Sequence, residues 1–243
     1  MSASTTPGFS HIPSATRALL REDLPDGVLR LHLTRHGRTE FNEQQLMQGW
    51  SDAPLTEAGL ANIRAAADLL ADTPYTAAYA SSLPRAVRTA EMILEHHPTL
   101  RVSTLDDLRE LHFGEFESRP VPEFMAHVGD PHTFFTSVFT GTSPALPGGE
   151  DGAAFAARTA DALEHIVNAH PDGGHVLVVA HGLTLKVLLA SAAGPILEPI
   201  SNAGVSIMDR MPDGELVIRA FNVDASGAAR AEPSVLRGLS QER

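Results

Sequence analysis

The sequence contains no cysteine and only one lysine, and both absences restrict its chemistry. Without cysteine it cannot form disulfides, a thiol nucleophile, an iron–sulfur cluster or a zinc–thiolate site. The one lysine, Lys186, lies five residues after His181 and not in a glycine-rich loop, so the Gly-x-x-x-x-Gly-Lys phosphate loop is missing. The sequence also lacks a His-Glu-x-x-His zinc motif.

Long apolar runs and excess positive charge are missing as well. No apolar run approaches the roughly 18 residues of a membrane span. The chain carries 30 acidic and 18 basic residues, a net charge of −12, which argues against partners such as nucleic acid or an anionic membrane. Residues 1–27 have no apolar stretch of signal-peptide length, so we expect a cytoplasmic protein.

Strand-like and helix-like patterns alternate along residues 28–224. This alternation predicts an α/β fold, a three-layer α/β/α sandwich around a mostly parallel sheet. The expected strands are Val28–Thr34, Tyr75–Ala80, His175–Ala180, Val205–Met211 and Glu215–Val223. The expected helices begin near Thr56, Pro84, Asp151 and Leu183. We interpret 28–224 as a single domain.

Three segments fit this alternation poorly. Residues 1–27 are predicted to form a flexible N-terminal extension with a short helix near Ala15–Arg21, and residues 225–243 a flexible tail. Residues 117–150 are rich in proline and glycine, and we expect them to form an inserted cap or lid. The aromatic side chains in and near this insert could contact a substrate or pack as its core, and the sequence leaves both open.

Two histidines come at the ends of expected strands. The first strand, Val28–Thr34, runs into Arg35 and His36, and the buried strand His175–Ala180 runs into His181. Each could simply end its strand with a backbone hydrogen bond. Ligands of open α/β sheets, however, bind at the carboxyl ends of strands, where both histidines are expected. Arg35 adds a planar donor fork suited to phosphate oxygens. A neutral His36 with one free ring nitrogen could act as a nucleophile.

Two further segments add charged groups to this picture. Residues 81–90 lie at a strand-to-helix junction and place Arg85 in the first turn of the helix, where anions bind. A carboxylic acid near a bound phosphate could protonate the leaving oxygen and later take a proton from water. Glu110, Glu115 and Glu117 are all candidates, and residue chemistry alone does not separate them.

Four segments in this order resemble the histidine phosphatase superfamily, in its phosphoglycerate mutase-like branch. The first is Arg-His-Gly-Arg-Thr-Glu-Phe-Asn at 35–42, followed by Gln-Gly-Trp-Ser-Asp-Ala-Pro-Leu-Thr at 48–56. The others are Ser-Ser…Arg-Ala…Thr-Ala at 81–90, Leu-Arg-Glu at 108–110 and Ala-His-Gly at 180–182. The resemblance covers about residues 29–223.

The resemblance implies a role for each matching residue. His36 occupies the position of the nucleophile that forms a phosphohistidine, and Glu110 the position of the general acid and base. Phosphoryl binding and lining of the phosphate pocket fall to Arg35, Arg85, His181, Asn42 and Gln48, with His181 also counted among the catalytic residues. Members of this branch use no metal, and we expect no cofactor.

The sequence departs from the glycolytic mutases of this branch in one informative place. Those enzymes carry arginine where this chain has Leu111, and they carry further basic residues in the insert, where Arg119 is the only basic residue of this chain besides histidines. We therefore predict a phosphomonoesterase acting on a small phosphorylated metabolite. A cofactor-dependent phosphoglycerate mutase and a catalytically silent phosphate-binding module are the alternatives, and a homodimer is left open. Ser118 stands where glycine is common in the family.

Overall fold

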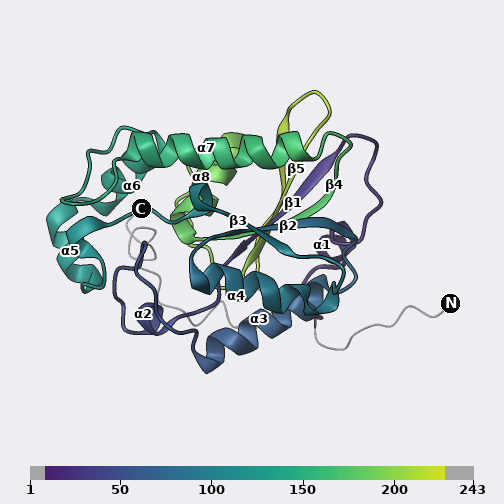
Figure 1. Ribbon diagram of the computed structural model, residues 1–243, viewed down its shortest axis with the longest axis horizontal. Helices are drawn as coiled ribbons and strands as arrows, with labels where there is room; N and C mark the ends of the chain where they lie inside the picture. The colour runs from purple at the N-terminus through teal and green to yellow at the C-terminus, as the bar shows by residue number, and fades with distance from the viewer. Residues whose placement is uncertain (1–8, 228–243) are drawn as a thin grey trace.

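The computed structural model describes residues 9–227, and within them the strands form one six-stranded sheet in the order β3-β2-β4-β1-β5-β6 (Figure 1). The strands are β1 (Leu29–Arg35), β2 (Tyr75–Ser81), β3 (Val102–Leu105), β4 (Gly174–Ala180), β5 (Val205–Arg210) and β6 (Leu216–Val223). The first four run parallel, whereas β5 pairs antiparallel with both β1 and β6. The predicted mostly parallel sheet is therefore confirmed.

The helices lie on both faces of the sheet, which confirms the three-layer sandwich. Figure 1 shows α3 (Glu57–Leu70) and α4 (Pro84–Ile93) on one face, and α7 (Gly152–Ala169) and α8 (Gly182–Ala193) on the other. Each face has its own apolar core against the sheet. Thr56 caps α3 by accepting from the Gly59 N–H, and Asp151 caps α7 by accepting from the Ala154 N–H.

Strand β3 was not predicted from the sequence. It is a four-residue edge strand whose two central residues, Ser103 and Thr104, are exposed. An exposed edge strand buries little apolar surface, so its sequence carries neither alternation nor an apolar run.

The predicted N-terminal extension, residues 1–27, packs against the domain over the part that the structure describes. Phe9, Ile12 and Leu20, which flank the short helix α1 (Ser14–Leu19), are buried in the same core as α3. The Arg30 guanidinium also donates to the Leu19 carbonyl at 2.7 Å. Apolar burial and this hydrogen bond hold the segment on the domain. Most of the predicted tail, 228–243, lies outside the described residues.

The insert contains two helices, α5 (Val121–Val128) and α6 (Pro131–Phe139), which lie with α2 (Glu40–Glu43) at one end of the molecule (Figure 1). A backbone bridge between Leu46 and Pro120 joins the segment after α2 to the insert. Five aromatic side chains are at most 9% exposed and pack edge to face in a small core, namely Phe113, Phe116, Phe124, Phe134 and Phe135. These rings form an apolar core in and beside the insert.

Ser118, at the start of the insert, explains one departure from the family pattern. Its φ is +63°, in the left-handed region that glycine adopts without steric cost. Serine therefore takes up a conformation here that favours glycine, and the Ser118 N–H donates to the Met47 carbonyl at 2.9 Å.

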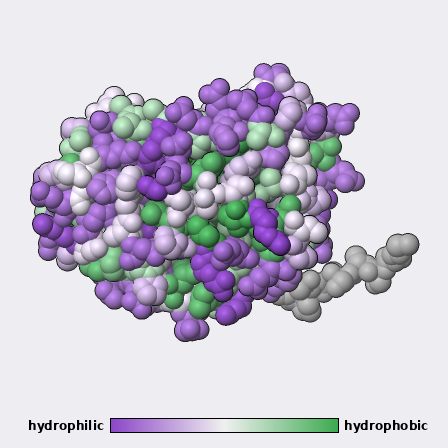
Figure 2. Space-filling view, in the orientation of Figure 1, coloured by the Kyte–Doolittle hydropathy of each residue, from purple (hydrophilic) through white to green (hydrophobic). Residues whose placement is uncertain are grey.

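Polar residues predominate along the margins of the face of the domain that Figure 2 shows. In Figure 2 hydrophilic residues cover most of the upper and lower margins of the visible face, over α7 and α3, with hydrophobic residues scattered between them. Trp50 is the one large hydrophobic side chain recorded as exposed among residues 9–227. No helix in that range combines the length and apolar character needed to cross a bilayer.

The packing of the insert yields a first prediction. Phe124 is fully buried and touches the rings of Phe113, Phe116 and Phe134, so Phe124→Ala should leave a cavity and lower the free energy of unfolding by about 3–5 kcal/mol. Urea unfolding followed by circular dichroism measures the change. Glu123→Ala, an exposed position on the same helix, is the control and should change stability little. A loss below about 1 kcal/mol for Phe124→Ala would contradict the packing.

Candidate active site

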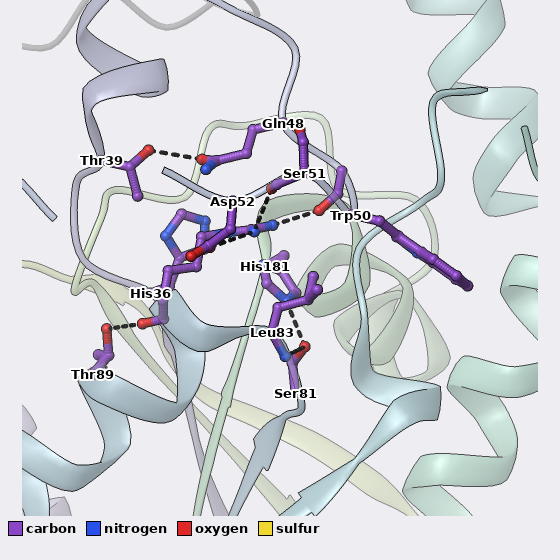
Figure 3. A network of polar contacts seen from close by, with 12 residues as sticks. His36, Thr39, Gln48, Trp50, Ser51, Asp52, Ser81, Leu83, Thr89 and His181 are labelled. Carbon is purple, nitrogen blue, oxygen red and sulfur yellow. Dashed lines mark hydrogen bonds and ion pairs between the residues drawn. The ribbon is translucent and has the colours of Figure 1, made fainter. Parts of the chain in front are cut away.

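The two histidines of the sequence motifs come together because their strands are neighbours. β1 and β4 pair in parallel with Arg35 opposite Ala180, so the residues that follow both strands emerge at the same edge of the sheet. The His36 N–H continues the ladder by donating to the Ala180 carbonyl at 2.9 Å. The imidazole centroids of His36 and His181 are 5.1 Å apart (Figure 3).

The His36 ring presents one free nitrogen. Its Nδ1 lies 2.8 Å from the Gly37 carbonyl oxygen, and because a carbonyl only accepts, Nδ1 carries the proton. Nε2 makes no hydrogen bond with the described residues and keeps its lone pair. Burial, together with the positive charges of Arg85 and Arg35, holds the pKa of His36 well below its ordinary value. The ring is therefore neutral at neutral pH, as a nucleophile must be.

Arg85 lies in the first turn of α4 and is almost completely buried. Its Nη2 donates to the Gly49 carbonyl at 2.6 Å, and its Nη1 donates to the Ser51 carbonyl at 3.0 Å. The buried Nε has no partner among the described residues. Burial lowers the pKa of Arg85 to about 10, which leaves it cationic at neutral pH.

The loop at residues 49–51, whose carbonyls accept from Arg85, also binds Glu117 through its backbone N–H groups. This role of Glu117 was not predicted from the sequence. The Glu117 carboxylate accepts from the backbone N–H groups of Gly49, Trp50 and Ser51 and from the Ser51 hydroxyl. Burial alone would raise the pKa of Glu117, but hydrogen bonds, led by those from Ser51, lower it below its usual range. Glu117 therefore stays ionised and fixes the loop to the insert.

Glu110 is buried at the N-terminus of α8. Its Oε2 accepts from the Leu183 N–H at 2.9 Å, and its Oε1 accepts from the Thr184 N–H at 3.2 Å. Burial raises the pKa of Glu110, against the opposing effect of the Leu183 N–H and of the two arginines. A Cβ at Gly182 would lie 3.7 Å from both Glu110 Oε2 and Arg35 Nε, so this glycine lies close to both charged groups.

The other two carboxylates that the sequence left open lie elsewhere. Glu115 is exposed, and Glu117 is engaged by the loop backbone. Of the three, Glu110 is the one that is at least nine-tenths buried and that also lies at the N-terminus of α8.

Arg35 and His181 complete the cluster. Arg35 Nη1 donates to the Ile200 carbonyl at 2.6 Å. His181 is fully buried, and its Nε2 lies 2.8 Å from the Ser81 hydroxyl, whereas its Nδ1 has no partner within residues 9–227. Burial and the charges of Arg85 and its neighbours hold the pKa of His181 well below its ordinary value.

The two predicted pocket residues, Gln48 and Asn42, lie in different environments from each other. The Thr39 hydroxyl donates to Gln48 Oε1 at 2.7 Å, and Gln48 Nε2 is buried with no partner in the described part of the chain. Asn42 belongs to the capping box of α2, where its Oδ1 accepts from the Thr39 N–H. That oxygen also accepts from Asn202, which donates in turn to the His36 carbonyl. Asn42 thus supports the site through hydrogen bonds.

Three buried atoms around the histidine pair lack partners within the described residues, namely Arg85 Nε, Gln48 Nε2 and His181 Nδ1. The first two are donors only. An unsatisfied buried donor is costly, and a site that gathers several of them beside cations suits an anion. In the same part of the chain, His, Asp and Glu side chains form no cluster of three that could hold a metal ion.

Two other supporting residues, Trp50 and Arg158, were assigned no role from the sequence. Trp50 Nε1 donates to the Glu110 carbonyl at 2.9 Å, although the indole itself points away from the histidines (Figure 3). Arg158, on α7, donates to the same carbonyl at 2.9 Å and pairs with Glu150. Both contacts join segments distant in the sequence, so only the folded chain reveals them.

The family follows from comparison with known proteins. The model of the histidine phosphatase superfamily (branch 1) matches residues 31–224. The chain belongs to this superfamily. A 2,3-bisphosphoglycerate-dependent phosphoglycerate mutase 2 of Gloeobacter violaceus is 35% identical over 162 residues, which are 65% of this chain and 73% of the relative. This result confirms the resemblance seen in the sequence motifs.

Solved structures of the superfamily include both mutases and phosphatases. The crystal structure of a phosphoglycerate mutase from Bacillus anthracis matches with a TM-score of 0.70 at 26% identity, over 84% of this chain and 96% of that one. A mycobacterial glucosyl-3-phosphoglycerate phosphatase matches with a TM-score of 0.69 at 26% identity, over 81% of this chain and 99% of that one. The likeness therefore extends equally to both activities.

The neutral histidines yield a second prediction, that acid destabilises the fold. The pKa values of His32, His36 and His181 are all held well below the ordinary 6.5 by burial. Below about pH 6.5 these histidines are protonated in the unfolded chain but stay neutral in the folded chain. Proton binding therefore favours the unfolded chain, and the free energy of unfolding decreases as the pH falls toward the folded pKa values. The midpoint of urea unfolding should therefore decrease steadily between about pH 7.5 and pH 5.

A variant tests the cause of this decrease. His36→Gln removes one of the titrating groups and should make the decline with pH shallower, whereas His127→Gln, at an exposed position, should leave the slope unchanged. Equal slopes for His36→Gln and the wild type would contradict the assignment of the effect to the buried site.

Proposed function

We propose that this protein is a cytoplasmic phosphomonoesterase that hydrolyses a small phosphorylated metabolite through a phosphohistidine on His36. The observation that carries the proposal is the neutral His36 ring, whose unengaged Nε2 lies among cations and buried donors at the edge of the sheet. Phosphoryl transfer needs a positioned nucleophile and stabilisation of charge on the phosphoryl oxygens, and this cluster can supply both.

The reaction divides into two displacements on phosphorus. In the first, His36 Nε2 attacks the phosphorus atom and the bond to the ester oxygen breaks. In the second, water attacks phosphorus and the bond to Nε2 breaks, which releases inorganic phosphate and restores the neutral ring. Arg35, Arg85 and His181 hold the phosphoryl oxygens in both steps, with Gln48 as a further donor. No metal or cofactor takes part.

Glu110 acts as general acid and then as general base in this scheme. Its raised pKa favours the protonated carboxyl that can give a proton to the leaving alkoxide. The resulting carboxylate is stabilised by the N–H groups of Leu183 and Thr184, and it then takes a proton from the attacking water. One carboxyl group thereby serves both displacements.

A phosphatase is favoured over a mutase by the insert. A mutase must retain and reorient a phosphorylated acid, which requires basic side chains above the site. Within the insert Arg119 is the one arginine, and it is exposed, with its guanidinium 6.0 Å from the Phe116 ring. Leu111 is buried where the mutases have arginine. Because phosphoglycerate mutases are among the relatives, mutase activity is the first alternative. A catalytically silent phosphate-binding module is the second.

The deciding experiment measures hydrolysis of p-nitrophenyl phosphate between about pH 5 and pH 8 with EDTA present. We expect turnover by the wild type and a loss of about 10³-fold or more for His36→Ala, because the nucleophile is removed. Rapid quenching with a radiolabelled substrate should trap a phosphoenzyme in the wild type and none in His36→Ala. His127→Ala, at an exposed position, is the matched control.

Other outcomes separate the alternatives. Interconversion of 2- and 3-phosphoglycerate after priming with 2,3-bisphosphoglycerate, without net hydrolysis, would establish the mutase. Binding of phosphate without turnover of either kind would establish the silent module. Activity lost in EDTA and restored by a divalent ion would overturn the metal-independent scheme.

The role of Glu110 yields a separate prediction. Glu110→Gln keeps the size of the side chain but removes the transferable proton, so esters with poor leaving groups should slow more than activated ones, by about 10²-fold or more in the ratio. Steady-state kinetics with an alkyl phosphate and with p-nitrophenyl phosphate give this ratio. Equal slowing of both esters would argue against the acid role.

A further inference from the structure

The two histidines of the site are held in different ways. His36 is fixed at Nδ1 by a backbone carbonyl, which leaves a lone pair on Nε2. His181 is fixed at Nε2 by the Ser81 hydroxyl, 2.8 Å away, and it leaves Nδ1 buried and without a partner among the described residues (Figure 3). A hydroxyl can donate or accept, so the position of the His181 proton depends on which way this hydrogen bond runs.

The second contact of Ser81 limits the choice. Ser81 is the last residue of β2 and is fully buried, and its Oγ accepts from the Leu83 N–H at 3.3 Å. Within the described residues, the only other polar partner of this oxygen is His181 Nε2. If Nε2 carried the proton, the serine hydroxyl would have no acceptor and His181 Nδ1 would face the site as a bare lone pair. Two buried groups would then be unsatisfied.

The reverse direction leaves one group unsatisfied. If Ser81 donates to Nε2, the hydroxyl is satisfied on both sides and His181 carries its proton on Nδ1. That N–H needs an acceptor. The charged and titratable groups that act on His181 are Arg85, Arg35, Arg158 and His36, none of which offers an anionic acceptor. A phosphoryl oxygen would supply it.

We propose that Ser81 is a positioning residue that fixes the His181 tautomer, so that His181 presents an N–H donor and not a lone pair to the phosphoryl group. The inference rests on the proposed function for the identity of the anion, but the direction of the hydrogen bond does not depend on it. Loss of the hydroxyl would free the ring to present its lone pair, which repels a phosphoryl oxygen.

The test combines spectroscopy with two variants. Nitrogen-15 NMR of histidine side chains distinguishes a protonated ring nitrogen from a bare one, and the His181 signals are assigned by their absence in His181→Asn. We expect the wild type to carry the proton on Nδ1 of His181. Ser81→Ala should shift the proton toward Nε2, weaken binding of inorganic orthovanadate, and lower kcat/KM by about 10- to 100-fold, the usual cost of losing a group that orients a site ligand.

Two matched variants separate orientation from packing. Ser81→Thr keeps the hydroxyl and should restore the Nδ1 proton and kcat/KM to within about threefold, as β-branched residues fit a strand end. Ser82→Ala removes the neighbouring hydroxyl, which contacts Asp106 and Arg109 outside the site, and should leave tautomer and vanadate binding unchanged.

The outcomes distinguish a failure of this inference from a failure of the proposed function. A wild-type His181 with its proton on Nε2 would overturn the role of Ser81, whatever the activity. If Ser81→Ala does not fold, the wild-type and Ser81→Thr spectra still decide the question. A protein with the proton on Nδ1 and no phosphatase activity would support the role of Ser81 and overturn the proposed function alone.

Discussion

The parallel pairing of β1 with β4 is the constraint on which the rest of the site depends. Because the two strands are hydrogen-bonded neighbours in register, the residues that follow them leave the sheet side by side. That register brings the ring centroids of His36 and His181 to 5.1 Å from each other, although 144 residues lie between them in the chain. The flanking helices then add Arg85 from one face of the sheet and the N-terminus of α8 from the other.

Concentrated positive charge in a buried place sets the protonation of the whole cluster. Burial first, and then the nearby arginines, lower the pKa of both histidines and keep the rings neutral, because a further positive charge there would be unfavourable. Glu110 responds to the same burial in the opposite sense and has a raised pKa. A protein with a net charge of −12 thus contains a buried cluster of arginine and histidine at one edge of its sheet, while Nζ of its only lysine, Lys186, donates to the Leu197 carbonyl.

The sequence predicted the sheet, its helices and the residues that the two strand ends bring together. These features rest on local patterns: apolar runs, turn residues and motifs that follow strands. It did not predict β3, the packing of Phe9 and Ile12, or the roles of Glu117 and Arg158. Each of these depends on a partner distant in the chain, such as the loop at Gly49 for Glu117, and no local pattern marks such a partner.

The way in which the site binds Arg85 has a consequence for selectivity. Each terminal nitrogen of its guanidinium donates to a loop carbonyl, Nη1 to that of Ser51 and Nη2 to that of Gly49, so the loop fixes the plane of the guanidinium and the direction of the buried Nε–H. The remaining donors come from the segment after α2, from α4 and from the β4–α8 junction, each in its own direction. Donors that converge from three elements in different directions match the tetrahedral arrangement of oxygens on the phosphoryl group of the proposed function, and a flat anion would meet fewer of them at once.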